Sequence, residues 1–206
     1  MILICFALKE EASPFRKLAE NQQGISILLT GIGRANAEKS VCEFLSKNAP
    51  ELVLTCGFAG GLNPELEIGD VIFEKPATCN LQLATFAKPA KVFCADRIAT
   101  TVAEKKLLRD QTGADAVEME SAAIHAVCAE KNIPCATVRV ISDTAHEDLP
   151  LDFNALAKPD KNLDFGKLFL AIARSPGKIP QLIALQKKTR IAAERLATVL
   201  EKVISA

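Results

Sequence analysis

The chain has 206 residues, of which 49% are hydrophobic and 24% charged, and its formal net charge at pH 7 is zero. This length and composition suit one soluble globular domain, and the zero net charge gives no bulk argument for a nucleic-acid partner. The charge is unevenly placed, because the residues from Lys161 onward hold nine Lys and Arg against three Asp and Glu. A basic C-terminal segment therefore follows an acidic body.

In the first half of the chain, strands alternate with helices. Continuous apolar runs predict buried strands at residues 2–8, 25–30 and 52–56, with another strand at 70–74. A helix is predicted to start at Ser13-Pro14, and residues 35–47 carry apolar side chains at helical spacing. The segment Gly57-Phe58-Ala59-Gly60-Gly61 follows the third strand, and its glycines would let backbone N–H groups approach a ligand or an anion.

The second half continues this alternation after residues 75–90, which we expect to be irregular with at most one strand. The pattern then predicts a strand at 91–94, a helix at 101–111 that stops at Gly113, a strand at 114–117, a helix at 120–131 and a strand at 136–141. Such alternation is typical of a layered α/β fold with a largely parallel sheet. We expect three layers, α/β/α, around a twisted, mostly parallel mixed sheet.

The alternation of strands and helices ends after Pro159. Two helices are predicted there, at residues 163–174 and 181–203, with a break at Ser175-Pro176-Gly177. We treat residues 160–206 as a helical extension of a single domain, 1–206. The last helix is basic. Its cations could form a solvated face or contact anionic lipid through Lys187, Lys188, Arg190 and Arg195.

The seven cysteines form no Cys-x-x-Cys pair, which favours reduced thiols in a cytoplasmic protein. The apolar start of the chain is short and leads straight into Lys9-Glu10-Glu11, so we predict no signal peptide. No apolar run has the length of a transmembrane helix. The two histidines lack the spacing of metal ligands, so no metal site is predicted.

Acidic side chains follow three predicted strands, in Glu10-Glu11, in Glu118-Met119-Glu120-Ser121 and in Ser142-Asp143. Ligands of open α/β sheets bind beyond the carboxyl ends of the strands, so one pocket could collect these carboxylates. Each segment also has a structural interpretation. Glutamates are favoured in the first turn of a helix, Ser121 could begin one, and an Asp after a strand is often a cap or turn residue.

Cleavage of a glycosidic C–N bond needs such a set of groups. A carboxylic acid must protonate the leaving base, and nearby carboxylates can stabilise the positive charge that develops on the sugar. A second carboxylate can deprotonate the attacking water, as in glycosidases. The acidic segments are therefore compatible with an N-ribosyl hydrolase or transferase.

Four blocks of sequence carry a family resemblance. They are Ala7-Leu8-Lys9-Glu10-Glu11, Thr30-Gly31-Ile32-Gly33-Arg34, Gly57-Phe58-Ala59-Gly60-Gly61 with Gly69-Asp70-Val71, and Val117-Glu118-Met119-Glu120-Ser121 with Val138-Arg139-Val140-Ile141-Ser142-Asp143. In this order they resemble the purine nucleoside phosphorylase/nucleosidase superfamily, above all the methylthioadenosine/S-adenosylhomocysteine nucleosidases, over about residues 1–153. The Ala95-Asp96-Arg97 region and the tail are more similar to the hopanoid-associated phosphorylases, which are thought to strip adenine from adenosylhopane.

The resemblance implies a phosphorylase/hydrolase-like fold and a role for each matching residue. Asp143 would protonate N7 of the leaving purine with support from Ser142, and Glu11 would activate the attacking water. Glu120 would bind the ribose hydroxyls. The remaining residues implied to contact substrate are Met119 against the sugar, the second acid Glu118, Phe153 near the nucleoside, and Phe58, Ala59 and Gly60 of the glycine-rich segment.

The sequence also departs from this family. Phe58 stands where the superfamily usually has Ser or Thr, and the Gly-Asp-Pro phosphate-binding motif of the phosphorylases is absent. Both departures favour hydrolysis over phosphorolysis, although Arg34 or Arg97 could still bind phosphate as a co-substrate. The segment between Glu74 and Val117 is shorter than in the nucleosidases, which could leave the 5′ side of the site open to a large substituent.

We therefore predict an enzyme that needs no cofactor and releases adenine from a 5′-substituted adenosine, adenosylhopane among the candidates. Phosphorolysis of a purine nucleoside and non-catalytic nucleoside binding remain alternatives. A dinucleotide-binding module is disfavoured because no Gly-x-Gly-x-x-Gly follows the first strand. By analogy with the family, we expect a homo-oligomer.

Overall fold

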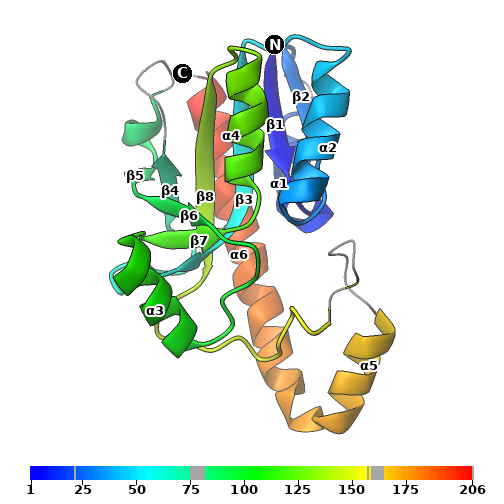
Figure 1. The fold of residues 1–206 in the computed structure, drawn as a ribbon, viewed down its shortest axis with the longest axis vertical. Coiled ribbons are helices and arrows are strands. Elements are labelled where there is room, and N and C mark those ends of the chain that lie inside the picture. The colour runs from blue at the N-terminus through cyan, green and yellow to red at the C-terminus, as the bar shows by residue number, and fades with distance from the viewer. Residues whose placement is uncertain (21, 75–81, 157, 159–164, 206) are drawn as a thin grey trace.

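The computed structural model describes residues 1–20, 22–74, 82–156, 158 and 165–205. A mixed sheet runs through the molecule, and its strands are β1 (Ile2–Phe6), β2 (Ile25–Leu29), β3 (Leu52–Gly61), β4 (Val71–Glu74), β5 (Lys88–Pro89), β6 (Val92–Cys94), β7 (Ala116–Glu118) and β8 (Cys135–Asp143) (Figure 1). Their order is β2-β1-β3-β8-β4-β5, while β7 pairs with β3 and β6 with β7. The pairs β3·β7 and β4·β8 are antiparallel and the other pairs are parallel, which confirms the predicted mostly parallel sheet.

The helices are α1 (Lys9–Leu18), α2 (Arg34–Leu45), α3 (Val102–Thr112), α4 (Ser121–Glu130), α5 (Phe165–Arg174) and α6 (Ile179–Ser205), with short 3₁₀ turns at Leu83–Thr85 and Pro176–Lys178. Helices α2 and α4 cover one face of the sheet and α1 and α6 the other, so the three-layer prediction is confirmed. Helix α5 and the first half of α6 extend beyond the sheet (Figure 1). Among the helices of the described residues, none has both the length and the apolar composition that crossing a membrane requires.

The first strand explains why these layers form. Successive side chains of a strand point to opposite faces of the sheet. Leu3 and Cys5 therefore pack in the cluster beneath α2 and α4, while Ile4 and Phe6 pack beneath α1 and α6. All four are at most 1% exposed, which accounts for the uninterrupted apolar run in the sequence.

The start of the first helix was predicted wrongly. Helix α1 begins at Lys9, and Pro14 lies inside it. The side chain of Glu11 accepts a hydrogen bond from the backbone N–H of Leu8 at 2.8 Å and so closes the first turn. Pro14 has no N–H to donate to the carbonyl of Glu10, and this single missing bond does not end the helix.

The two central strands are longer than predicted. β3 continues through Gly61, so the segment Gly57–Gly61 is a strand and not a loop, and β8 continues through Asp143. The two strands pair in parallel as far as Gly60 and Asp143, with a register shift after Ala59. Each extension supplies the other's hydrogen bonds. This tertiary pairing outweighs the tendency of glycine to end a strand.

Two further predictions are settled only in part. Residues 75–81 and 163–164 lie outside the described residues. Within the described remainder of 75–90, the strand is β5. The predicted helix near residues 101–111 is confirmed as α3. Thr101 and Glu104 form a reciprocal capping box at its start, and Gly113 ends it with φ 64°.

Candidate active site

A cavity of about 270 Å³ lies at the carboxyl ends of the parallel strands β1, β3 and β8. All ten residues that the sequence predicted to catalyse or bind substrate line it, namely Glu11, Phe58, Ala59, Gly60, Glu118, Met119, Glu120, Ser142, Asp143 and Phe153. The strands gather these residues because parallel strands end at one edge of the sheet. Four carboxylates from three separate segments thus face one small space.

The Glu11 carboxylate is held by backbone donors from two elements. It accepts a hydrogen bond from Leu8 N–H at 2.8 Å and one from Phe58 N–H at 2.8 Å. Burial raises the pKa of Glu11 from 4.5 to about 7, although the hydrogen bond from Phe58 and the charge of Arg139 oppose the rise. A carboxylate with this pKa can accept a proton near neutral pH.

Gly57 lets Glu11 come this close to β3. Its φ is 151°, which side-chain-bearing residues rarely adopt. A Cβ atom at this position would lie 2.7 Å from Glu11 Oε1 and 2.7 Å from Arg139 Nη1. The predicted role of the glycine-rich segment is therefore modified, since the backbone N–H of Phe58 binds a carboxylate of the protein itself.

Arg139 is a fully buried cation behind the cavity. Its guanidinium pairs with Glu118, lies 3.8 Å from Glu120 Oε2, and donates to Thr55 Oγ1 at 3.0 Å. Burial would lower the pKa of Arg139, but the charges of Glu118, Glu120 and Glu11 raise it above its usual value. One permanent positive charge therefore serves three carboxylates.

Glu118 and Glu120 differ in how they are held. Glu118 accepts from the backbone N–H groups of Glu120 and Ser121, both at 2.9 Å, and from the Ser121 hydroxyl at 2.6 Å. Burial alone would raise the pKa of Glu118, but Arg139 and these hydrogen bonds lower it. Glu118 is therefore a fixed anion whose acceptor sites are occupied by the protein.

Glu120 has a smaller set of partners. Its Oε1 accepts from Gly33 N–H at 2.8 Å. Burial raises the pKa of Glu120, with Arg139 opposing the rise and Glu118 adding to it. Glu120 precedes α4, as its interpretation as a helix start predicted, but its side chain does not cap that helix.

Asp143 lies at the end of β8, and its partners differ from those of the three glutamates. Its Oδ1 accepts from the Ser142 hydroxyl at 2.8 Å, and its Oδ2 forms an ion pair with Lys105 Nζ at 2.6 Å. Lys105 belongs to α3 and is 0% exposed, while Asp143 is 6% exposed. The interpretation of Asp143 as a helix cap is wrong, because it is the last residue of a strand.

The two predicted phosphate-binding arginines do not line this cavity. Arg34 donates to the carbonyl of Cys94 and pairs with Asp96 at 3.2 Å, beside a separate pocket. Arg97 pairs with Glu104 at the start of α3. The structure thus brings together the carboxylates but not these cations.

Sequence reasoning missed several residues of the site. Lys105 shares one face of α3 with Thr101 and Leu108, at the spacing of an inward-facing stripe, and this was the available signal. Leu185 and Thr189 of α6 also line the cavity. Nothing in the local sequence indicates that the C-terminal helix reaches this far, because its position depends on packing against α1 and the sheet.

Comparison with known proteins agrees with this geometry. Residues 13–75 and 87–205 match the phosphorylase superfamily. The chain belongs to this superfamily. The family assignment made from the four sequence blocks is therefore confirmed.

Two relatives of this superfamily member are nucleosidases by name. The aminodeoxyfutalosine nucleosidase of Campylobacter jejuni is 29% identical over 158 residues, which cover 60% of this chain and 69% of the relative. The 5′-methylthioadenosine/S-adenosylhomocysteine nucleosidase of Shewanella sediminis is 25% identical over 167 residues, with coverage of 63% and 73%. The predicted enzyme class agrees with both names.

Solved structures extend the agreement to the whole fold. The 5′-methylthioadenosine/S-adenosylhomocysteine nucleosidase of Helicobacter pylori superposes with a TM-score of 0.70 over 99% of this chain and 97% of that one, at 18% identity. The futalosine hydrolase of the same organism also gives a TM-score of 0.70 at 18% identity, with the same coverage. At this identity the likeness establishes the fold.

Proposed function

We propose that the protein hydrolyses the N-glycosidic bond of a 5′-substituted adenosine and releases adenine. The observation that carries this proposal is that one cavity holds two carboxylates with different surroundings. Glu11 is held in surroundings that raise its pKa to about 7, whereas Asp143 lies against a buried ammonium group. Glu11 therefore suits the role of proton acceptor, and Asp143 suits the proton-donating side of the reaction.

In the proposed mechanism, Asp143 passes a proton to N7 of the leaving adenine while the C1′–N9 bond breaks. The bonding electrons leave with the base, and the sugar gains positive charge. Glu120 and Glu11, which line the same cavity, favour that charge. Glu11 accepts a proton from the attacking water, whose oxygen bonds to C1′.

The residues of the site favour water over phosphate as the acceptor of the ribosyl group. Phe58 carries no hydroxyl that could bind phosphate, and its N–H is used by Glu11. Arg34 and Arg97, the predicted phosphate ligands, have other carboxylate partners outside the cavity. A phosphate acceptor would need cations that these arginines do not supply in the present arrangement.

The finer proposal concerns the 5′ group. A groove of about 910 Å³ between α1 and α6 shares Phe58 and Thr189 with the cavity. Its walls include Leu18, Ile183 and Ala193. Polar and charged side chains, among them Lys17 and Arg190, also line the groove. The apolar part of the wall supports a bulky hydrocarbon 5′ substituent, for which adenosylhopane is the candidate from the family resemblance.

Contact with anionic lipid through the basic helix remains a proposal as well. Among the four cations named for this contact, Lys188 pairs with Glu147 and Arg190 lies 3.8 Å from Glu194. Replacing Lys187, Lys188, Arg190 and Arg195 by Gln should abolish binding to anionic vesicles. Wild-type protein that does not bind such vesicles in sedimentation assays would contradict the idea.

The experiment that tests the reaction measures adenine release by chromatography from adenosine, 5′-methylthioadenosine and a 5′-alkyl adenosine, with and without phosphate. We expect release without phosphate, and a loss of about 10² to 10⁴ in rate for Asp143→Asn. Release that requires phosphate would identify a phosphorylase instead. Binding of the nucleosides with no release from any of them would leave a binding protein and overturn the proposal.

A further inference from the structure

We propose that Lys105 is a positioning residue for Asp143, which it holds in place and supplies with the proton that reaches the leaving base. This inference rests on the proposed function of the cavity. It is carried by the surroundings of the Lys105 side chain, which is buried at 0% exposure behind the cavity and does not line it. A buried ammonium group is costly unless its charge and all its N–H bonds are satisfied.

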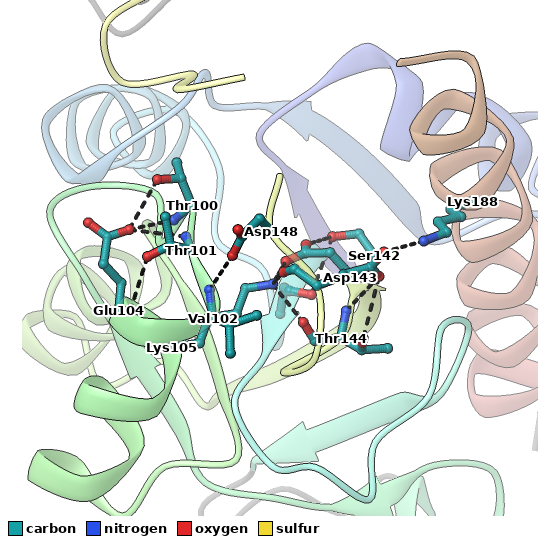
Figure 2. Close-up of polar contacts among 12 residues, drawn as sticks. Thr100, Thr101, Val102, Glu104, Lys105, Ser142, Asp143, Thr144, Asp148 and Lys188 are labelled. Atoms are coloured by element: carbon teal, nitrogen blue, oxygen red, sulfur yellow. Dashed lines mark hydrogen bonds and ion pairs between the residues drawn. The ribbon is translucent and has the colours of Figure 1, made fainter. Parts of the chain in front are cut away.

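Three oxygens surround the Lys105 ammonium (Figure 2). Nζ lies 2.6 Å from Asp143 Oδ2, and it donates to the backbone carbonyls of Thr144 at 2.6 Å and Glu147 at 2.9 Å. Two of the three N–H bonds of the ammonium group donate to these carbonyls, and the ion pair with Asp143 balances its charge. The contact with Oδ2 is close but poorly aligned for a hydrogen bond, which makes it primarily an ion pair.

The loop after β8 is shaped around this lysine. The Thr144 N–H donates to Glu147 Oε1 at 3.0 Å, and the Leu149 N–H donates to the carbonyl of Thr100 at 2.8 Å. Asp148 accepts from the backbone N–H of Val102 at 2.7 Å. The loop that presents two carbonyls to Lys105 is therefore tied to the start of the same helix that carries Lys105 (Figure 2).

The charged groups around the pair come from several elements. They are Glu104 and Arg97 near the start of α3, Glu147 and Asp148 in the loop, Lys188 of α6, and Glu11, Glu118, Glu120 and Arg139 around the rest of the site. Burial would raise the pKa of Glu147, but its bonds from Lys188 and Thr144 lower it. Glu147 therefore remains an anion that faces Lys188, and the ion pair of Asp143 is with Lys105.

The proton balance follows from these contacts. At rest, Lys105 is charged and Asp143 ionised. As the C1′–N9 bond breaks, a proton moves from Lys105 Nζ to the Asp143 carboxylate and from there to N7, while Glu11 takes a proton from water. Lys105 becomes a neutral amine whose two remaining N–H bonds still face the carbonyls of Thr144 and Glu147. The net charge of the site is unchanged, and the proton on Glu11 returns through solvent.

A double-mutant cycle tests this inference with 5′-methylthioadenosine as substrate. Lys105→Met should lower kcat at least about tenfold in the wild-type background, with KM changed much less, and should change kcat less than about twofold in Asp143→Asn. The alkaline limb of kcat/KM should move to lower pH in Lys105→Met. A merely structural lysine would lower kcat equally in both backgrounds and leave the pH limbs in place, and either result would overturn the proposal.

Controls separate this test from folding and from the proposed function itself. Lys106→Met removes the neighbouring, exposed lysine that pairs with Asp110, and it should leave kcat unchanged. The Tm of the two single variants and of the double variant should be non-additive, because each single change leaves one buried charge unpaired. Additive Tm values would overturn the pairing.

Full activity of Lys105→Arg would overturn proton supply, since a guanidinium does not release its proton. Absence of adenine release by the wild type would instead refute the proposed function.

Discussion

Two buried cations support the carboxylates of the cavity, and they are used differently. Arg139, from β8, serves Glu118, Glu120 and Glu11 together, so negative charge is in excess around it. Lys105, from α3, pairs with Asp143, and the two form a neutral pair. Both cations are at most 1% exposed.

This difference shows how one small cavity can hold opposite proton-transfer roles. Where carboxylates outnumber the cation, burial and mutual repulsion raise the pKa of Glu11 and Glu120, which prepares that side to accept a proton. The Arg139 guanidinium supplies charge only, because it does not release its proton. The ammonium group on the other side can do both.

The largest effect should come from removing the proton acceptor. Glu11→Gln should lower kcat by about 10² to 10⁴, because the attacking water loses its base. Wild-type kcat/KM should rise with pH through about 7, where Glu11 becomes ionised, and this acid limb should vanish in the variant. Rate measurements from pH 5 to pH 9 would check both, and an unchanged acid limb would assign the base to another group.

The free energy of unfolding should fall with pH over the range in which kcat/KM rises. Between about pH 4.5 and 7 the folded protein keeps a proton on Glu11 that the unfolded chain has released, so the free energy of unfolding falls as pH rises. Above pH 7 this contribution is lost. Urea unfolding at several pH values should show this slope in the wild type and a smaller slope in Glu11→Gln.

A smaller effect should follow from crowding the Arg139 side. Gly57→Ala places a Cβ atom 2.7 Å from both Glu11 Oε1 and Arg139 Nη1 at a φ of 151°. We expect a loss of about 1–3 kcal/mol in stability and a reduced kcat, because the carboxylate must move. Thermal unfolding would measure the loss. Gly177→Ala is the matched control, since a Cβ atom there meets nothing within 4 Å.

The smallest effect should come from the outer contact on the Lys105 side. Lys188→Gln breaks the pair with Glu147, whose two side chains are 34% and 29% exposed. A partly exposed pair contributes at most about 1 kcal/mol, and the three contacts of Lys105 do not depend on Lys188. Chemical unfolding and kcat of Lys188→Gln would be measured beside Lys202→Gln, which removes an exposed lysine of the same helix and serves as the control. A fall in kcat of more than about tenfold in Lys188→Gln alone would show a larger role for α6.

The sequence alone determined the elements whose signals are local. The apolar run of residues 2–8 predicted β1, and Thr101 and Gly113 marked the ends of α3, because capping and burial on both faces leave direct traces in the chain. The order of the four sequence blocks predicted the superfamily and the residues that gather at the cavity. Local signals failed at Ser13-Pro14, because the helix starts earlier, with the Leu8 N–H donating its capping bond to Glu11.

Only the tertiary structure decided the chemistry of the carboxylates. Helical spacing places Lys105 on the inward face of α3, but it does not show what the ammonium group meets there. Lys105 acquires its role from two carbonyls that lie about 40 residues later in the chain. The extension of β3 likewise depends on pairing with β8, and the pKa of Glu11 on burial beneath that strand. Charge, burial and distance between remote segments set proton affinity, and a linear sequence does not contain those distances.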